Sequence, residues 1–127
     1  MASGSFATAV NCMDGRTQLP VIEWMKREHG VDYVDMITAP GADGILSRGE
    51  AREIETLKER VLISVGKHGS RVIAVAGHHD CAGNPVSREE HLADIRTAVG
   101  VVHGWNLPAA VVGLWVGDDW KAEAVEV

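Results

Sequence analysis

The sequence contains no apolar run near the roughly 20 residues that a membrane-spanning helix requires. Its first residues, MASGSFATAV, have no basic cluster ahead of an apolar stretch, so they do not resemble a secretory signal peptide. These two absences lead us to expect a cytoplasmic protein with no membrane partner. With 127 residues, of which 46% are hydrophobic, the chain has the size and composition of a globular domain. We expect residues 1–127 to form a single domain.

Basic residues are also few. The chain has 12 lysines and arginines against 18 acidic residues, which gives a net charge of −6. Binding through nucleic-acid phosphates needs a basic face, so this balance argues against a nucleic-acid partner. No G-x-G-x-x-G or Walker pattern follows an expected strand, which argues against a nucleotide site as well.

Cysteine is limited to two residues, Cys12 and Cys81. In a secreted protein they would form one disulfide, and buried free cysteines also pack well in apolar cores. In a cytoplasmic protein, cysteines with histidines nearby more often bind a metal or take part in catalysis. His78 lies three positions before Cys81. That spacing favours a metal site, because a disulfide would leave the histidine unexplained.

Short apolar runs alternate with longer amphipathic segments, a pattern typical of an α/β domain with a mostly parallel sheet. Three helices are expected, the last two each opened by an S-x-x-E capping box, with a glycine-rich loop at 39–46 and a second loop at 78–86. The helices start near Thr17, Ser47 and Ser87 and end near His29, Lys67 and Val102. The expected strands cover residues 6–11, 32–38, 71–77 and 109–116, followed by a short antiparallel strand at 120–127.

The wholly apolar segment 71–77 is typical of a strand at the centre of a sheet. We predict a four-stranded parallel sheet of order 2-1-3-4, with an antiparallel fifth strand at the edge and helices on the faces. Ligands of doubly wound sheets bind beyond the carboxyl ends of the strands, where the winding direction reverses. Strands 1 and 3 are neighbours at that reversal. Cys12, after the first, should therefore meet His78 and Cys81, after the third.

Two thiolates and an imidazole make a favourable zinc site, and Cys12, His78 and Cys81 are the predicted ligands. Three protein ligands leave a fourth position open, as in catalytic rather than structural zinc sites. A water on such a zinc loses its proton near pH ~7, which gives a hydroxide nucleophile.

Asp14 and Arg16 share the loop of Cys12, and their spacing favours an ion pair. An arginine fork binds a carboxylate bidentately and keeps it ionised. Asp14 is then suited to accept the proton of the zinc-bound hydroxide and to orient it. If the pair breaks, Asp14 is able to occupy the fourth zinc position instead. The alternative interpretation is that Arg16 forms an ordinary surface ion pair, which would add little stability.

The pattern C-x-D-x-R at 12–16, followed some sixty residues later by H-x-x-C at 78–81, resembles the β-class carbonic anhydrases. The resemblance spans nearly the whole chain. It implies zinc on Cys12, His78 and Cys81, a catalytic dyad of Asp14 and Arg16, and reversible conversion of CO2 and water to bicarbonate and a proton. It also implies a homodimer or a higher assembly. An apolar edge supports the same expectation, with partner side chains closing the pocket.

The chain departs from the family pattern in its pocket loops. The family loop that commonly reads asparagine-alanine-glycine is here Pro40-Gly41-Ala42-Asp43-Gly44. The two glycines that usually follow the second cysteine are here replaced by Ala82-Gly83. These changes concern the pocket wall, so two alternatives stay open. One is hydrolysis of carbonyl sulfide or carbon disulfide at the same zinc, and the other is a zinc-bearing or bicarbonate-sensing domain without turnover.

The remaining polar and aromatic residues receive ordinary structural roles. We expect Asp80 to cap a turn, His79 to lie at the surface or behind the ligands, and Asp43 to be a candidate for facing the pocket. Solvated or capping roles are expected for His29, His68, His91 and His103. Core or dimer contacts are expected for Trp105, Trp115 and Trp120.

Overall fold

The structure, a computed structural model, describes residues 3–127. Its elements are β1 (Phe6–Asn11), α1 (Gln18–His29), β2 (Tyr33–Thr38), α2 (Ala42–Arg48), α3 (Ala51–His68), β3 (Val72–His78), α4 (Arg88–His103), β4 (Ala110–Val116) and β5 (Ala122–Val125). The sheet has the order β2-β1-β3-β4-β5, with β1 to β4 parallel and β5 antiparallel to β4. The predicted fold class and strand order are confirmed.

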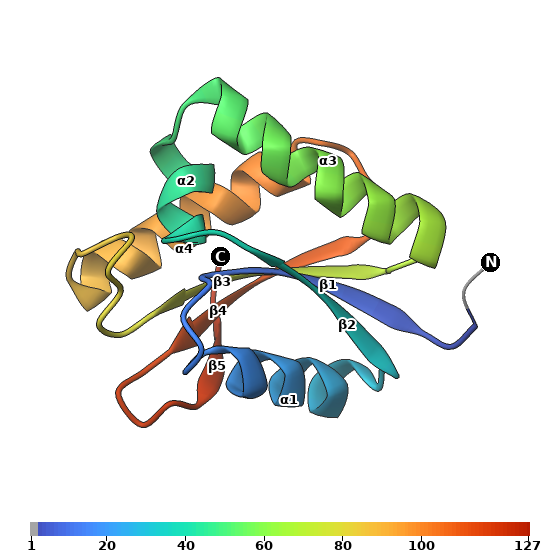
Figure 1. Ribbon diagram of the computed structural model, residues 1–127, viewed down its shortest axis with the longest axis horizontal. Coiled ribbons are helices and arrows are strands. Elements are labelled where there is room, and N and C mark those ends of the chain that lie inside the picture. Colours follow the sequence, from blue (N-terminus) through green and yellow to red (C-terminus); the bar gives the residue numbers. More distant parts are fainter. Residues whose placement is uncertain (1–2) are drawn as a thin grey trace.

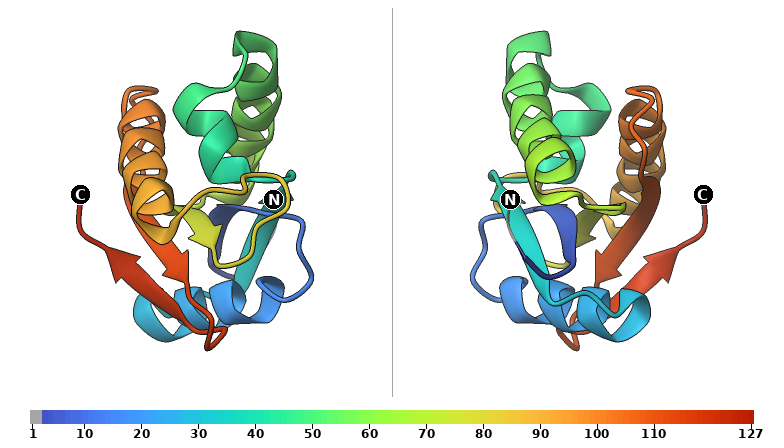
Figure 2. Two further views of the ribbon diagram at one scale, coloured as in Figure 1. Left: turned by 90° about the vertical axis from the view of Figure 1, so that its left-hand side faces the viewer. Right: turned by 90° about the vertical axis from the view of Figure 1, so that its right-hand side faces the viewer.

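The helices lie on both faces of the sheet (Figure 1). Helix α1 covers one face, and α2, α3 and α4 cover the other, as the two side views also show (Figure 2). The chain therefore crosses on one face from β1 to β2 and on the opposite face from β2 to β3. The winding direction reverses between β1 and β3, and their carboxyl ends meet at the left-hand edge in Figure 1. Loops that follow these two strands are brought together there.

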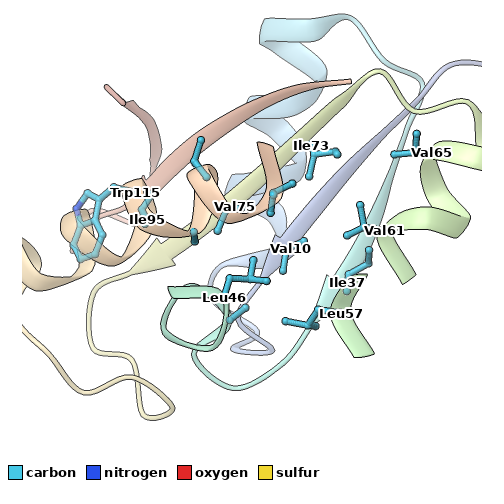
Figure 3. Packing of buried hydrophobic residues seen from close by; sticks show 14 residues of the cluster. Val10, Ile37, Leu46, Leu57, Val61, Val65, Ile73, Val75, Ile95 and Trp115 are labelled. Carbon is cyan, nitrogen blue, oxygen red and sulfur yellow. The ribbon is translucent and has the colours of Figure 1, made fainter. Parts of the chain in front are cut away.

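Successive side chains of the central strands point to opposite faces of the sheet, so each face has its own hydrophobic core. In β3, Ile73 and Val75 face the cluster beneath α2, α3 and α4, where Leu46, Leu57 and Ile95 are buried (Figure 3). The other face of the sheet is built mainly from small residues, and α1 packs on it through a buried stripe of Val21, Trp24 and Met25. Alanines on that face let a single helix approach the sheet closely.

Most of the predicted segments form with shifts of one or two residues, which is the ordinary uncertainty of helix and strand ends. The Ser87–Glu90 capping box at the start of α4 is present in both directions. The predicted stripe of α3 is buried at Leu57, Val61 and Val65. The last strand is shorter than the expected 120–127, because Trp120 belongs to the turn that precedes it.

The segment expected to be a glycine-rich loop at 39–46 is instead largely helical. Helix α2 begins after Gly41, whose φ of 63° is left-handed, and buries Ala42 and Leu46. The predicted Ser47–Glu50 capping box is wrong as a consequence: Ser47 lies inside α2, and Glu50 precedes α3 without a side-chain cap. Burial of the apolar residues outweighs the low helix propensity of the glycines.

Thr17 does precede α1, but it does not cap the helix as expected. Its backbone is helical and its side chain makes no cap hydrogen bond. The hydroxyl instead donates to the carbonyl of Asp14 at 2.8 Å. Among residues 3–127, no helix is both long and apolar enough to cross a membrane.

Candidate metal centre

The two strand ends bring Cys12, His78 and Cys81 together. Cys12 follows β1 directly, His78 ends β3, and Cys81 lies three residues beyond it. One ligand atom from each of the three side chains lies within 4.8 Å of the others, and all three residues are buried. The group could hold a metal ion.

His78 is fixed with one ring nitrogen free. Its Nδ1 lies 2.7 Å from the carbonyl oxygen of His79, which only accepts, so Nδ1 carries the proton. The neutral ring then has its lone pair at Nε2, and this buried atom has no hydrogen-bond partner among the described residues. Burial lowers the pKa of His78, which favours the neutral form that binds metals. A backbone partner on the second nitrogen is the usual arrangement for a metal-binding histidine.

The cysteines also suit a divalent cation. Their Sγ atoms are 3.9 Å apart. Two sulfur ligands at ~2.3 Å in a tetrahedral zinc site would be separated by roughly 3.8 Å, so the spacing fits. Burial raises the pKa of Cys81 to about 11 in the protein without metal. A neighbouring dication would reverse that preference by stabilising the thiolate.

Asp14 and Arg16 form the expected ion pair. Asp14 Oδ1 accepts from the backbone N and Nε of Arg16 at 2.9 and 3.1 Å, and Oδ2 accepts from Nη2 at 2.7 Å. The Arg16 hydrogen bonds lower the pKa of Asp14 to about 2, so the carboxylate is ionised. Asp14 is therefore engaged by Arg16 and lies outside the group of three potential metal ligands.

Arg16 has two further neighbours. Asp80, expected to cap a turn, has a left-handed φ of 56° and accepts from Nη1 of Arg16 at 3.2 Å. Trp120, expected in the core or a dimer contact, is half-buried and packs against the core on the α1 face of the sheet. Its ring centroid lies 4.3 Å from Arg16 Cζ. The motif at 12–16 reveals neither contact, because both Asp80 and Trp120 are far from Arg16 in the sequence.

Two residues that sequence reasoning overlooked, Asn11 and Gln18, hold the Cys12 loop together with Thr17. Buried Asn11 accepts from the Cys12 amide at 2.9 Å and donates to Thr17 at 3.2 Å. Gln18 Nε2 donates to the carbonyls of Cys12 and Asp14 at 2.8 and 3.0 Å. The available signal for Asn11 was its position as a polar residue at the carboxyl end of a mostly apolar strand.

A buried polar cluster behind the site was also missed. His91, expected to be solvated, is buried, and its Nδ1 lies 2.6 Å from Oδ2 of Asp43, which is equally buried. Asp43 thus faces a histidine of α4. Asn84 donates to Asp43 and Asp94 at 3.2 and 3.0 Å, and Arg48 binds Asn84 and Asp94. His91 lies four residues before buried Ile95, so its helical spacing was the unused signal for an inward-facing position.

Two glycines allow the loops around the cysteines to touch. A Cβ on Gly83 would lie 2.4 Å from the carbonyl carbon of Pro40, and one on Gly41 would lie 2.5 Å from that of Gly83. The amide of Gly41 in turn lies 3.5 Å from Cys12 Sγ. Close backbone contact next to a thiol therefore requires glycine at both positions.

The side chains of the other histidines and tryptophans are not part of the potential ligand group. His29, His79 and His103 are exposed, as expected, and His68 Nδ1 lies 2.6 Å from Asp35 Oδ2. Trp115 is buried in the core, and half-buried Trp105 lies over Lys58. A cavity of about 340 Å³ borders Phe6, His29, His68 and Arg71. These residues are at the opposite edge of the sheet, so this cavity does not serve the cysteine group.

Known proteins similar in sequence or fold to this chain were found in two of three comparisons. A family profile described as "Putative carbonic anhydrase" matches residues 2–126. A search of curated proteins finds no match. Solved structures with a similar fold include a carbonic anhydrase from Glaciozyma antarctica, at a TM-score of 0.60 and 17% identity, over 94% of this chain and 81% of that one.

Two fungal proteins are similar at lower scores. One is a tetrameric β-carbonic anhydrase from Sordaria macrospora, with a TM-score of 0.55, 14% identity and coverage of 98% and 83%. The other is the β-carbonic anhydrase CafA from Aspergillus fumigatus, with a TM-score of 0.51, 14% identity and coverage of 94% and 74%. Identities this low support a common fold and no more. Since the family profile matches nearly the whole chain, the protein belongs to the "Putative carbonic anhydrase" family, with the fold of the β-carbonic anhydrases.

Proposed function

We propose that the protein is a zinc-dependent carbonic anhydrase that converts CO2 and water reversibly to bicarbonate and a proton. The observation that carries the proposal is the buried group of Cys12, His78 and Cys81, in which His78 Nε2 has no partner. Family membership and the β-carbonic anhydrase fold support the same reaction. Three ligands leave room for one more at a four-coordinate ion, the arrangement of catalytic zinc sites.

Cys12, His78 and Cys81 would hold the ion. When bound, zinc would supply a Lewis acid that lowers the pKa of water to about 7 and so provides a nucleophile at neutral pH. Both cysteines are free thiols in this structure, and a reducing compartment keeps them so. On this basis we propose a cytoplasmic location.

Asp14 would orient the attacking water. Its Oδ1 already accepts two hydrogen bonds from Arg16, whereas Oδ2 accepts one and keeps a free lone pair. Oδ2 is therefore the atom suited to accept a hydrogen bond from the nucleophile. Arg16 keeps Asp14 ionised and off the metal position.

We further propose that the active form is a homodimer or a higher homo-oligomer. Met13 and Leu19, on either side of the 14–18 segment, are 62% and 66% exposed. A second copy that covers both side chains would bury apolar surface beside the Cys12 loop. Sedimentation analysis of the purified chain would measure the assembly.

The function is tested by assaying CO2 hydration by stopped flow on zinc-loaded protein. Carbonyl sulfide and carbon disulfide are assayed with the same sample. We expect turnover of CO2 that is abolished in a Cys81→Ser variant. Turnover of a sulfur-containing substrate alone would instead assign a hydrolase. A fully loaded protein with no turnover of any of the three would leave a zinc- or bicarbonate-binding domain.

A further inference from the structure

The guanidinium of Arg16 is held from three directions. Asp14 binds Nε and Nη2, and Asp80 accepts from Nη1 through its carboxylate and from Nη2 through its carbonyl, both at 3.2 Å. Trp120 covers one face, with the ring centroid 4.3 Å from Cζ. The motif C-x-D-x-R contains only the first of these contacts.

The backbone at Asp80 and Trp120 adopts an uncommon conformation. Among residues 3–127, non-glycine residues with positive φ are Asp80 at 56°, Asn106 at 56° and Trp120 at 55°. Asparagine and aspartate tolerate this region, but for a bulky residue such as tryptophan it is an outlier. Such conformations persist where the surrounding structure enforces them, and they cluster at functional sites. Two of the three contact the same guanidinium.

Backbone hydrogen bonds hold Trp120 and the residue before Asp80. The Trp120 amide donates to Gly117 at 3.0 Å, within the tight turn between β4 and β5. The His79 amide donates to Val116 at 2.9 Å and continues the pairing of β3 with β4 one residue beyond His78. The two contacts therefore come from segments that follow β3 and β4, while Arg16 itself lies in the loop after β1. The Trp120 ring is also close to His78, at 6.3 Å between centroids.

We propose that Trp120 and Asp80 are positioning residues that lock the Arg16 guanidinium in the orientation that binds Asp14, and thereby keep Asp14 off the metal site. The inference rests on the proposed function in that it assigns a metal to Cys12, His78 and Cys81. A planar guanidinium stacks on an aromatic face and binds carboxylates along its edges. Turning Arg16 away from Asp14 would break its contacts with Asp80 and Trp120.

The first test uses metal-free protein and needs no activity. Trp120→Leu removes the aromatic face, and Trp120→Phe retains one. The exchange rate of the Arg16 Nε–H proton is followed by NMR. We expect exchange to be several-fold faster in the Leu variant and intermediate in the Phe variant. Trp105→Leu is the matched control, because it removes the tryptophan over Lys58 and should leave the Arg16 signal unchanged.

Asp80→Asn is the second variant, since asparagine tolerates the same φ and the fold is retained. It removes the charge and should speed Arg16 exchange in the same direction. Thermal melts identify any variant that is unfolded. Unchanged exchange in folded Trp120→Leu and Asp80→Asn would overturn the inference.

The second test observes the metal. In cobalt-substituted protein, Trp120→Leu should change the visible absorption spectrum as Asp14 enters the coordination sphere, while metal content stays constant. Adding Asp14→Ala should remove that change. A spectral change that survives without Asp14 would contradict the proposal. Wild-type protein that binds no metal would refute the proposed function, but the exchange result would still decide the role of Trp120 and Asp80 toward Arg16.

Discussion

The Sγ atoms of Cys12 and Cys81 lie 3.9 Å apart although 69 positions separate the two residues. That distance is far longer than the ~2.05 Å of a disulfide, so the thiols are adjacent and unbonded. They meet because β1 and β3 are parallel neighbours whose carboxyl ends lie at one edge of the sheet. Two neighbouring buried thiols with a free imidazole nitrogen beside them are chemically suited to a soft divalent cation.

Adjacent histidines provide a matched pair for the ligand assignment. His78→Gln should lower zinc affinity by more than the roughly 10–100-fold that loss of an outer-sphere partner causes, because it removes a ligand atom. His79→Gln should retain zinc, since that side chain is exposed and only its backbone carbonyl contacts His78. Metal content after dialysis against a weak chelator measures both. Equal loss in the two variants would contradict the assignment of His78.

Asp14→Asn should keep its zinc and lose turnover by about 10²-fold or more, in the range of general-base losses. Asp118→Asn, at an exposed turn, is the control.

Because the pKa of Asp14 is about 2, its titration should not appear in the activity profile above pH ~4. Its stabilising effect is present above the ordinary value of 3.8 and is lost as the pH falls toward 2. Activity that rises across pH 5–7 in wild type but not in Asp14→Asn would contradict this.

Zinc binding at pH 7 should release at least one proton per ion. The pKa of Cys81 is raised to about 11 by burial, so its thiol is protonated in the metal-free protein and must ionise to bind. Calorimetric titrations in buffers of different ionisation enthalpy measure the number of protons. Binding without proton release would show that the thiol is not a ligand.

The same shift affects the stability of the metal-free protein at high pH. Folding keeps the Cys81 proton where the unfolded chain loses it, so stability should fall as the pH rises from the ordinary value of 9.0 to about 11. Zinc-loaded protein should lack this decline if Cys81 is already a thiolate. Urea unfolding at pH 8 and pH 10.5, with and without zinc, compares the two forms.

Glycine substitutions test the contact of the two pocket loops. Gly83→Ala would drive a methyl group to 2.4 Å from Pro40, so we expect a lower melting temperature and weaker zinc binding. Gly66→Ala, in the interior of α3 with nothing within 4 Å of the added methyl, should stabilise the protein by up to about 1 kcal/mol. A Gly83→Ala protein that melts and binds zinc like wild type would show that the contact is unimportant.

The strand order and the convergence of Cys12, His78 and Cys81 were predictable because periodicity and the crossover rule act on long segments. Helix α2 was not, since Gly41 before it and Gly44 within it favour a loop by themselves. Its helical form depends on burial of Leu46 and on Asn84, which occupies the space where a Gly44 side chain would lie. Such contacts come from residues far away in the sequence.

The polar interior shows a similar limit. The buried pair of Asp43 and His91 joins α2 to α4, and neither residue type indicates burial by itself. His91 was expected to be solvated, and only the tertiary structure shows its burial and supplies its acceptor. Trp120 likewise reaches Arg16 through the β4–β5 turn, which local sequence does not specify.

X-ray absorption at the zinc edge of the purified protein identifies the atoms that bind the metal. We predict one zinc per chain, with two sulfur atoms near ~2.3 Å, one imidazole nitrogen near ~2.0 Å and one further light atom. Replacing Cys81 with serine should remove the metal. A protein that binds no zinc, or a zinc shell with fewer than two sulfur atoms, would contradict this prediction.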